Sequence, residues 1–287
     1  MALDFGAEQE STTTESTGTV KELFLGLLWL GTSMLTAHAS LTGDTDGPQG
    51  ALGAAAAALP GVIAATLLTG ASIGHAASSR FRSALGRLLA GLGVGTLFGV
   101  AAAVALRLAY GTTPSIMVLA LTVGAASVAG GAIAILPSSV LEAGLWATTW
   151  VFFAGVIFGV WQATWLTKTP FGDPDKAAST WFVLAQSVFT GFLAGVYSAR
   201  NLRNEKPGFG WFLAGGAVPG VILLVAEAFS RIGGASLAKL VSGFSTKDPI
   251  LIKLSDAAAL RHALIVLAVG VGVAAIYAVR AARESDD

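Results

Sequence analysis

Long apolar runs, separated by short polar turns, fill the chain from about residue 20 to about residue 280. Each run is close to the roughly 20 residues that an α-helix needs to cross the hydrocarbon core of a bilayer. Polar and apolar positions do not alternate, and the runs are about twice as long as a membrane β-strand. The pattern therefore predicts an all-α polytopic bundle of transmembrane helices. The eight expected spans are 22–41, 50–74, 88–110, 114–136, 141–166, 179–199, 209–230 and 261–280.

Two segments outside the spans are polar. Residues 1–19 contain four acidic residues among Ser and Thr without apolar periodicity, which favours a disordered cytoplasmic leader. No basic region precedes the first span, so we expect that span to be retained and not cleaved as a signal peptide. Segment 233–258 is too polar to span, but apolar residues recur in it at helical spacing, which indicates an interfacial helix. This segment either caps the bundle as an outer loop or acts as a gate or a docking element.

The basic residues predict an orientation. An even number of crossings places both termini on one side of the membrane, and three basic clusters fall on that same side. By the positive-inside rule this side is cytoplasmic, although five basic residues within 231–261 on the other side weaken the count. Abundant Ala, Gly and Arg favour a GC-rich bacterial genome and hence a bacterial inner membrane. The clusters are Arg80, Arg82 and Arg87; Arg200, Arg203 and Lys206; and Arg280 and Arg283.

A short motif occurs twice and indicates an internal repeat. The pattern T-G-x-x-x-G begins at Thr69 and again at Thr190, an offset of 121 residues. A basic turn, an L-A-G tripeptide, a terminal Arg and a later V-L-A tripeptide follow in the same order in both places. We therefore expect two halves of four helices each, 20–138 and 139–287. Because each half has an even number of spans, the halves should enter the membrane with the same polarity, as a parallel repeat.

The glycines of this motif are expected to pack helices together. Lipid tails solvate apolar side chains as well as protein does, so close backbone approach at small residues is what favours contact between membrane helices. Chance matches are common in Ala- and Gly-rich helices, and G-x-x-x-G alone is a weak signature. The helix-packing residues predicted here are Gly70, Gly74, Gly191 and Gly195.

Composition excludes several classes of protein. Apolar residues make up 54% of the chain and charged residues 12%, against roughly 25% charged in a soluble domain. The 17 basic and 17 acidic residues cancel, so no cationic excess favours nucleic acid as a partner. The chain contains no Cys, which removes thiolate metal sites and thiol chemistry. The expected partners are the lipid bilayer, other membrane proteins or a second copy of the chain, and a small-molecule or lipid substrate.

Ionisable and amide side chains inside spans are candidate site residues, because burying a charge in the bilayer is costly. Glu227 precedes Arg231 by four residues, the favourable order for an ion pair on one helical face. Arg107, His38 and Gln162 also lie toward the outer ends of their spans. These five residues are predicted to converge on one outward-facing polar pocket for substrate. In the alternative interpretation, the arginines anchor helix ends in the headgroups and Glu227 only neutralises Arg231.

The aromatic and acidic residues of the fifth span have ordinary explanations at this point. Trp146 and Trp150 fit the aromatic belt at a membrane interface, and Glu142 fits the favourable N-terminal end of a helix. Nucleotide-binding, zinc-protease and serine-hydrolase motifs are absent, and three distant His residues do not indicate a metal or haem site. The sequence thus favours a protein without a catalytic site, metal or cofactor.

Two functions remain open from the sequence. The first is a transporter or a permease-like subunit that handles a small or amphipathic solute. The second is a scaffold or an accessory subunit of a larger membrane complex, which uses its glycine faces and segment 233–258 for contacts.

Overall fold

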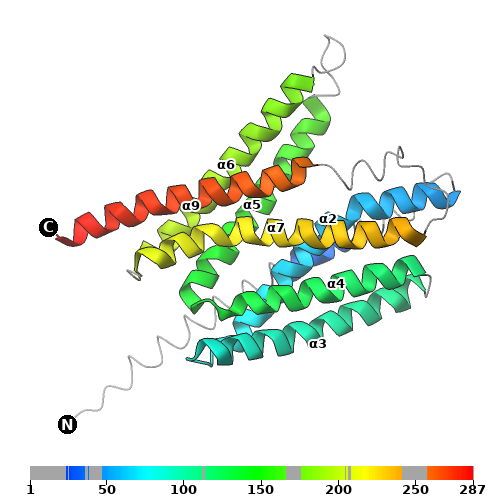
Figure 1. Ribbon diagram of the computed structural model, residues 1–287, viewed down its shortest axis with the longest axis horizontal. Coiled ribbons are helices and arrows are strands. Elements are labelled where there is room, and N and C mark those ends of the chain that lie inside the picture. The colour runs from blue at the N-terminus through cyan, green and yellow to red at the C-terminus, as the bar shows by residue number, and fades with distance from the viewer. Residues whose placement is uncertain are drawn as a thin grey trace. The chain divides into compact units, whose positions relative to one another are not determined.

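A computed structural model describes most of the chain as helix (Figure 1). It describes residues 24, 26–35, 38, 47–111, 114–165, 176–203, 205, 208–240 and 257–286, and the predicted leader lies outside these ranges. The long helices are α2 (Gly47–Ser78), α3 (Ala84–Tyr110), α4 (Pro114–Ala132), α5 (Ser138–Trp165), α6 (Lys176–Arg203), α7 (Phe209–Leu240) and α9 (Ala257–Asp286). A short 3₁₀ turn, η1 (Ile133–Ile135), follows α4.

Seven of the described helices are long and apolar enough to cross a membrane, and the described residues include no strand. This confirms the prediction of an all-helical, multi-pass membrane protein. A shorter apolar helix, Gly26–Leu35, lies within the first predicted span, so an eighth crossing stays a prediction. The seven segments are Leu59–Ser78, Ala84–Tyr110, Ile116–Ile135, Ser138–Trp161, Trp181–Arg203, Phe209–Ser236 and Ala257–Arg283.

Helix α7 continues about ten residues beyond the predicted end of the seventh span at residue 230, to Leu240. Two serines near the start of this extension and within it donate hydrogen bonds to the backbone of the same helix. Ser230 Oγ donates to the carbonyl oxygen of Ala226 at 2.7 Å, and Ser236 Oγ donates to that of Ile232 at 2.9 Å. Of the predicted interfacial segment 233–258, residues 233–240 continue α7 and residues 257–258 begin α9. Residues 241–256 lie outside the described residues, so an interfacial helix there remains a prediction.

The contacts divide the chain into two compact units. Unit 1 comprises Met1–Ser138 and Ile232–Ser242, and unit 2 comprises Ser139–Arg231 and Gly243–Asp287. In unit 1, α2, α3 and α4 pack side by side (Figure 1). The core of unit 1 contains Val62, Leu106, Ala120 and Val123, and Met34 of the first helix packs against it.

Glycines allow close backbone contact in unit 1. A Cβ atom on Gly70 of α2 would clash with the carbonyl oxygen of Ser127 on α4. A Cβ on Gly74 would lie 3.1 Å from the Cα of Gly131, one turn further along α4. At the same level of α4, Ser127 Oγ donates to the carbonyl oxygen of Gly95 on α3 at 2.8 Å. These contacts leave no room for larger residues where the three helices meet.

The turn that joins α2 to α3 is fixed by local hydrogen bonds. Ser83 caps α3 and accepts a hydrogen bond from the Gly86 N–H at 3.1 Å, as a helix N-cap should. Arg87 donates to the carbonyl oxygen of Arg82 at 3.0 Å and to that of Ile135 at 3.1 Å. A cation beside the free carbonyls that end α4 and η1 is electrostatically favourable, so Arg87 ties this turn to the helix end.

Unit 2 is built from α5, α6, α7 and α9. Its core includes Val140, Ala199, Leu202, Phe212 and Ala278. Glycines again allow close helix contact, now between α6, α7 and α9. Cβ atoms on Gly191 and Gly195 of α6 would lie 2.8 Å and 2.6 Å from the Cβ atoms of Val269 and Val273. A Cβ on Gly216 of α7 would lie 2.6 Å from the carbonyl oxygen of Gly270.

Candidate functional site

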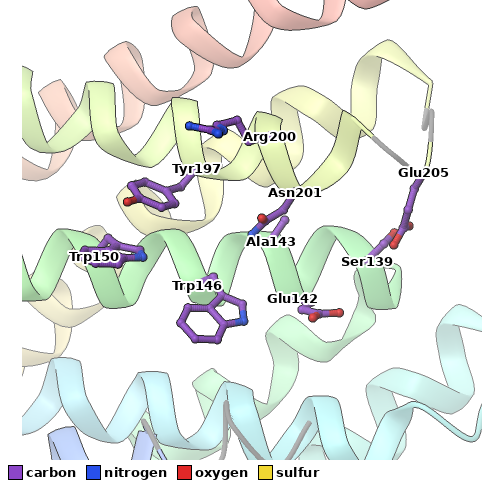
Figure 2. A pocket seen from close by; sticks show the side chains of 9 residues that line it. All are labelled: Ser139, Glu142, Ala143, Trp146, Trp150, Tyr197, Arg200, Asn201 and Glu205. Atoms are coloured by element: carbon purple, nitrogen blue, oxygen red, sulfur yellow. The ribbon is translucent and has the colours of Figure 1, made fainter. Parts of the chain in front are cut away.

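A pocket of about 450 Å³ opens in unit 2, between the first half of α5 and the end of α6 (Figure 2). Its volume falls within the roughly 300–1,000 Å³ range of small-molecule sites. Its aromatic lining is Trp146, Trp150 and Tyr197, and its polar lining is Ser139, Glu142, Arg200, Asn201 and Glu205.

Helical spacing places these side chains on two facing stripes. On α5, Glu142, Trp146 and Trp150 follow one another at intervals of four residues, which puts them on one face of the helix. On α6, Tyr197 is followed by Arg200 and Asn201 at intervals of three and four residues. The neighbouring residues Ala147 and Ala199 are fully buried, so the small side chains face the core while the large ones surround the pocket.

The aromatic rings of the pocket contact one another. Trp150 and Tyr197 stack with their ring centroids 5.0 Å apart and their planes at 17°. Phe153 meets the other side of Trp150 edge-on, with a centroid distance of 5.9 Å. Aromatic contacts in these geometries are favourable, so the position of Trp150 is fixed although 36% of its surface is exposed.

The charges of the pocket are unequally distributed. Two carboxylates, Glu142 and Glu205, line it together with one guanidinium, Arg200, which gives a formal excess of one negative charge. Figure 2 shows Glu205 beside Ser139, on the same side as the Glu142 carboxylate, while Arg200 extends toward the side of Tyr197. Glu142 is partly buried and Glu205 is exposed. The site therefore has an acidic end and an aromatic end, and the guanidinium lies beside the aromatic end.

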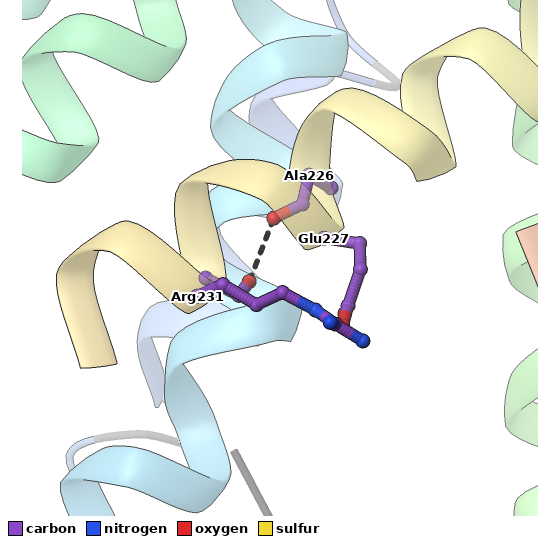
Figure 3. Close-up of polar contacts among 4 residues, drawn as sticks. Ala226, Glu227 and Arg231 are labelled. Carbon is purple, nitrogen blue, oxygen red and sulfur yellow. Dashed lines mark hydrogen bonds and ion pairs between the residues drawn. The ribbon is translucent and has the colours of Figure 1, made fainter. Parts of the chain in front are cut away.

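The predicted ion pair of α7 is present (Figure 3). Arg231 Nε donates to Glu227 Oε1 at 2.7 Å. The Glu227 side chain is 12% exposed and the Arg231 side chain 38%, so the carboxylate is the more buried partner. The short distance and the burial of Glu227 indicate a specific contact between the two side chains.

The other three predicted site residues are placed separately. In unit 1, His38 Nδ1 lies 3.1 Å from the hydroxyl oxygen of Tyr110 on α3, and the Arg107 side chain is exposed. Gln162 lies on α5, and its side chain is outside the described part of the structure. Convergence of all five residues on one pocket stays a prediction, because they are divided between two units.

A second polar contact joins α6 to α9. Ser187 Oγ donates to the carbonyl oxygen of Val183 at 2.6 Å and lies 2.7 Å from His262 Nδ1. Because the hydroxyl proton is used on Val183, Nδ1–H of His262 must donate to Ser187, which leaves Nε2 unprotonated in the neutral ring. Ser187 is fully buried, so this Ser–His pair acts as a hydrogen bond between helices and not as an accessible nucleophile.

Sequence reasoning missed the pocket for identifiable reasons. Trp146, Trp150 and Glu142 each had an ordinary explanation when considered alone, and Arg200 was counted only as a basic flank. Tyr197 lies among small residues and Asn201 within the basic cluster, and neither carried a signal of its own. The spacing of Glu142, Trp146 and Trp150 at intervals of four residues was the detectable signal, because it gathers a carboxylate and two indoles on one helical face.

Among the described residues, no group of three or more His, Cys, Asp or Glu side chains could hold a metal ion. Comparison of the chain with family models, with curated proteins and with solved structures finds no match.

Proposed function

We propose that this protein is a transporter, or a permease-like subunit of one, for a small or amphipathic solute. The observation that supports this most directly is the pocket between α5 and α6. A cavity of ligand size with charged and aromatic walls, built on membrane helices, is what solute recognition requires. A protein that only holds other subunits together has no physical need for such a cavity.

The proposal includes a multi-pass location in the cytoplasmic membrane of a bacterium, with both termini cytoplasmic. Seven apolar helices support the multi-pass part. The basic clusters after the second, sixth and last predicted spans support the orientation, if the first predicted span also crosses. In this orientation the pocket lies near the cytoplasmic ends of α5 and α6, because Arg200 belongs to the second of these clusters.

The proposal also includes the parallel repeat of four plus four helices, and the glycine contacts support it. Four contacts of unit 1 have counterparts in unit 2 at constant offsets, which are 121 residues from α2 to α6, 125 from α3 to α7 and 139 from α4 to α9. Chance matches of small residues would not keep three offsets constant over pairs of contacting residues. The counterparts are Gly70–Ser127 and Gly191–Val266, Gly74–Gly131 and Gly195–Gly270, Gly91–Gly131 and Gly216–Gly270, and Gly95–Val128 and Gly220–Leu267.

Transport is tested by uptake into sealed vesicles. The purified full-length protein is reconstituted into liposomes and offered labelled organic cations, organic anions and neutral amphiphiles. Uptake above that of empty liposomes, abolished in Glu227→Gln but retained in Ser236→Ala on the same helix, supports the proposal and a role for Glu227. Absence of uptake for all three classes by a correctly folded protein contradicts transport by the isolated chain.

A scaffold is the second candidate, and the outward apolar face of α3 favours it. Leu97 and Leu108 are 72% and 83% exposed, so this face is available to lipid or to a partner helix. Purification from native membrane in mild detergent, followed by mass spectrometry, distinguishes the two roles. A stoichiometric partner that is lost when Leu97 is replaced by Trp supports the scaffold, whereas a protein without a partner supports the transporter.

A further inference from the structure

We propose that the pocket of unit 2 binds an organic ammonium ion, whose charge lies at the acidic end of the pocket and whose apolar part lies against the aromatic rings. The inference rests on the proposed function only where it takes this ion to be the transported solute. Binding itself depends on the geometry of α5 and α6 alone.

The charges of the pocket favour a cation. Glu142 and Glu205 lie on one side of it, with Ser139 beside Glu205, and the single guanidinium extends toward the other side (Figure 2). An anion would have to approach two carboxylates, whereas both of them would attract an ammonium group. Because Glu142 is partly buried, its charge is screened less by solvent than that of an exposed carboxylate.

The aromatic rings favour an ammonium group with attached carbon over a metal cation. An ammonium group held over the face of a Trp or Tyr ring is attracted by the ring quadrupole, and this attraction grows when water is excluded. Trp146 lies one helical turn from Glu142 on the same stripe of α5, so carboxylate and indole can contact one ligand together. The stacked pair Trp150 and Tyr197 then offers an apolar surface for the rest of the molecule.

The corresponding positions of unit 1 lack this combination. At the offset of 121 residues, Tyr197 and Asn201 correspond to Ala76 and Arg80. An aromatic ring is replaced by a methyl group, and a neutral amide is replaced by a cation that would repel an ammonium ion. The chemistry of the pocket is therefore particular to unit 2.

The test measures binding to the full-length protein in nanodiscs of phosphatidylglycerol by isothermal titration calorimetry. The probe is benzyltrimethylammonium, with benzenesulfonate as the matched anion and benzyl alcohol as the neutral analogue. We expect binding of the ammonium probe and at least tenfold weaker binding of the other two. Equal or tighter binding of benzenesulfonate or benzyl alcohol overturns the inference, as does absence of binding by a folded protein.

Variants locate the probe. Glu142→Gln and Trp150→Leu are each expected to weaken binding about tenfold, in line with a lost charge contact and a lost aromatic contact to the apolar part of the probe. Glu205→Gln removes the second carboxylate of the acidic end. Because Glu205 is exposed, its replacement should not disturb folding. The controls are Glu8→Gln, which removes the same charge from the leader, and Trp181→Leu, an exposed residue of α6 outside the pocket. Equal losses in controls and pocket variants overturn the assignment of the site.

Two further measurements address where the ammonium group comes from and whether the bound ion is transported. If nanodiscs of phosphatidylcholine suppress binding of the free probe, the natural ligand is a lipid headgroup; if they do not, it is a free solute. Both results keep ammonium recognition. Binding without uptake into vesicles supports the binding site and contradicts transport. Uptake of an anion or a neutral amphiphile without ammonium binding supports transport and contradicts the ammonium site.

Discussion

Under the proposed repeat, unit 1 and unit 2 can be compared position by position, at the offsets of their glycine contacts. Thr66 of α2 and Ser187 of α6 are counterparts, and each donates a hydrogen bond to the carbonyl oxygen of a valine four residues earlier. The third helix then differs, since the position of Val123 on α4 is occupied by His262 on α9. Ser187 therefore has a hydrogen-bond partner on another helix at a position where unit 1 has an apolar residue.

The same contrast extends to the charged and aromatic groups. Unit 2 contains the pocket and the buried carboxylate of Glu227, whereas the position matching Glu227 at the α3 to α7 offset is Ala102. Close helix packing is thus found in both units, and buried hydroxyl groups occur in both, whereas the pocket and the Glu227–Arg231 ion pair belong to unit 2. Packing restricts each position to a few small residues, but the pocket positions are free to differ between the units.

The largest expected effect on stability comes from disrupting the close helix packing found in both units. Gly70→Ala should lower the free energy of unfolding by about 1–3 kcal/mol, because its Cβ would clash with a backbone oxygen that cannot rotate away. Gly191→Ala should cost somewhat less, since its nearest obstacle, the Cβ of Val269 at 2.8 Å, is farther away than the oxygen that faces Gly70. Gly61→Ala on α2 is the control, because nothing lies within 4 Å of its Cβ position. Thermal unfolding in detergent measures all three, and equal stabilities would refute the packing assignment.

An intermediate effect on stability is expected from the hydrogen bond between Ser187 of α6 and His262 of α9. Ser187→Ala leaves the buried Nδ1–H of His262 without its partner, which should destabilise unit 2 by about 1 kcal/mol. Adding His262→Val, the residue of unit 1, should relieve part of this loss. A double-mutant cycle is expected to give a coupling of about 0.6 kcal/mol, typical of such bonds in membranes. Thr66→Ala is the control in unit 1, where no histidine contacts the hydroxyl group. If it lowers the stability as much as Ser187→Ala does, the contact with His262 adds nothing measurable.

The smallest expected effect on stability belongs to the ion pair of α7. Glu227→Gln should reduce the free energy of unfolding by only about 0.3 kcal/mol, because the pair is a local i,i+4 contact and Arg231 is 38% exposed. Chemical unfolding of variant and parent side by side checks this. A loss above 1 kcal/mol would give Glu227 a structural role and make its effect on uptake uninformative.

The sequence predicted the helices well and the site poorly. Span length and hydropathy are local properties, so seven membrane helices could be identified from them. The offsets between the two halves of the proposed repeat were harder to predict, because sequences rich in Ala and Gly can be aligned at several different offsets. The L-A-G and V-L-A motifs align at 124 and 148 residues, whereas the contacts correspond at 125 and 139. The pocket depends on which faces of α5 and α6 meet, and one helix alone does not carry that information.

The buried hydroxyl groups have a consequence for how the chain is made. Thr66, Thr69, Thr148, Ser187 and Ser230 each donate to a carbonyl oxygen one turn earlier in their own helix. Their polar atoms are therefore satisfied before any second helix arrives, so these hydroxyl groups do not oppose partition of a single span into lipid during synthesis. Each helix that carries one can enter the bilayer by itself, and the contacts that need a neighbouring span, such as the glycine contacts and the Ser127–Gly95 hydrogen bond, follow.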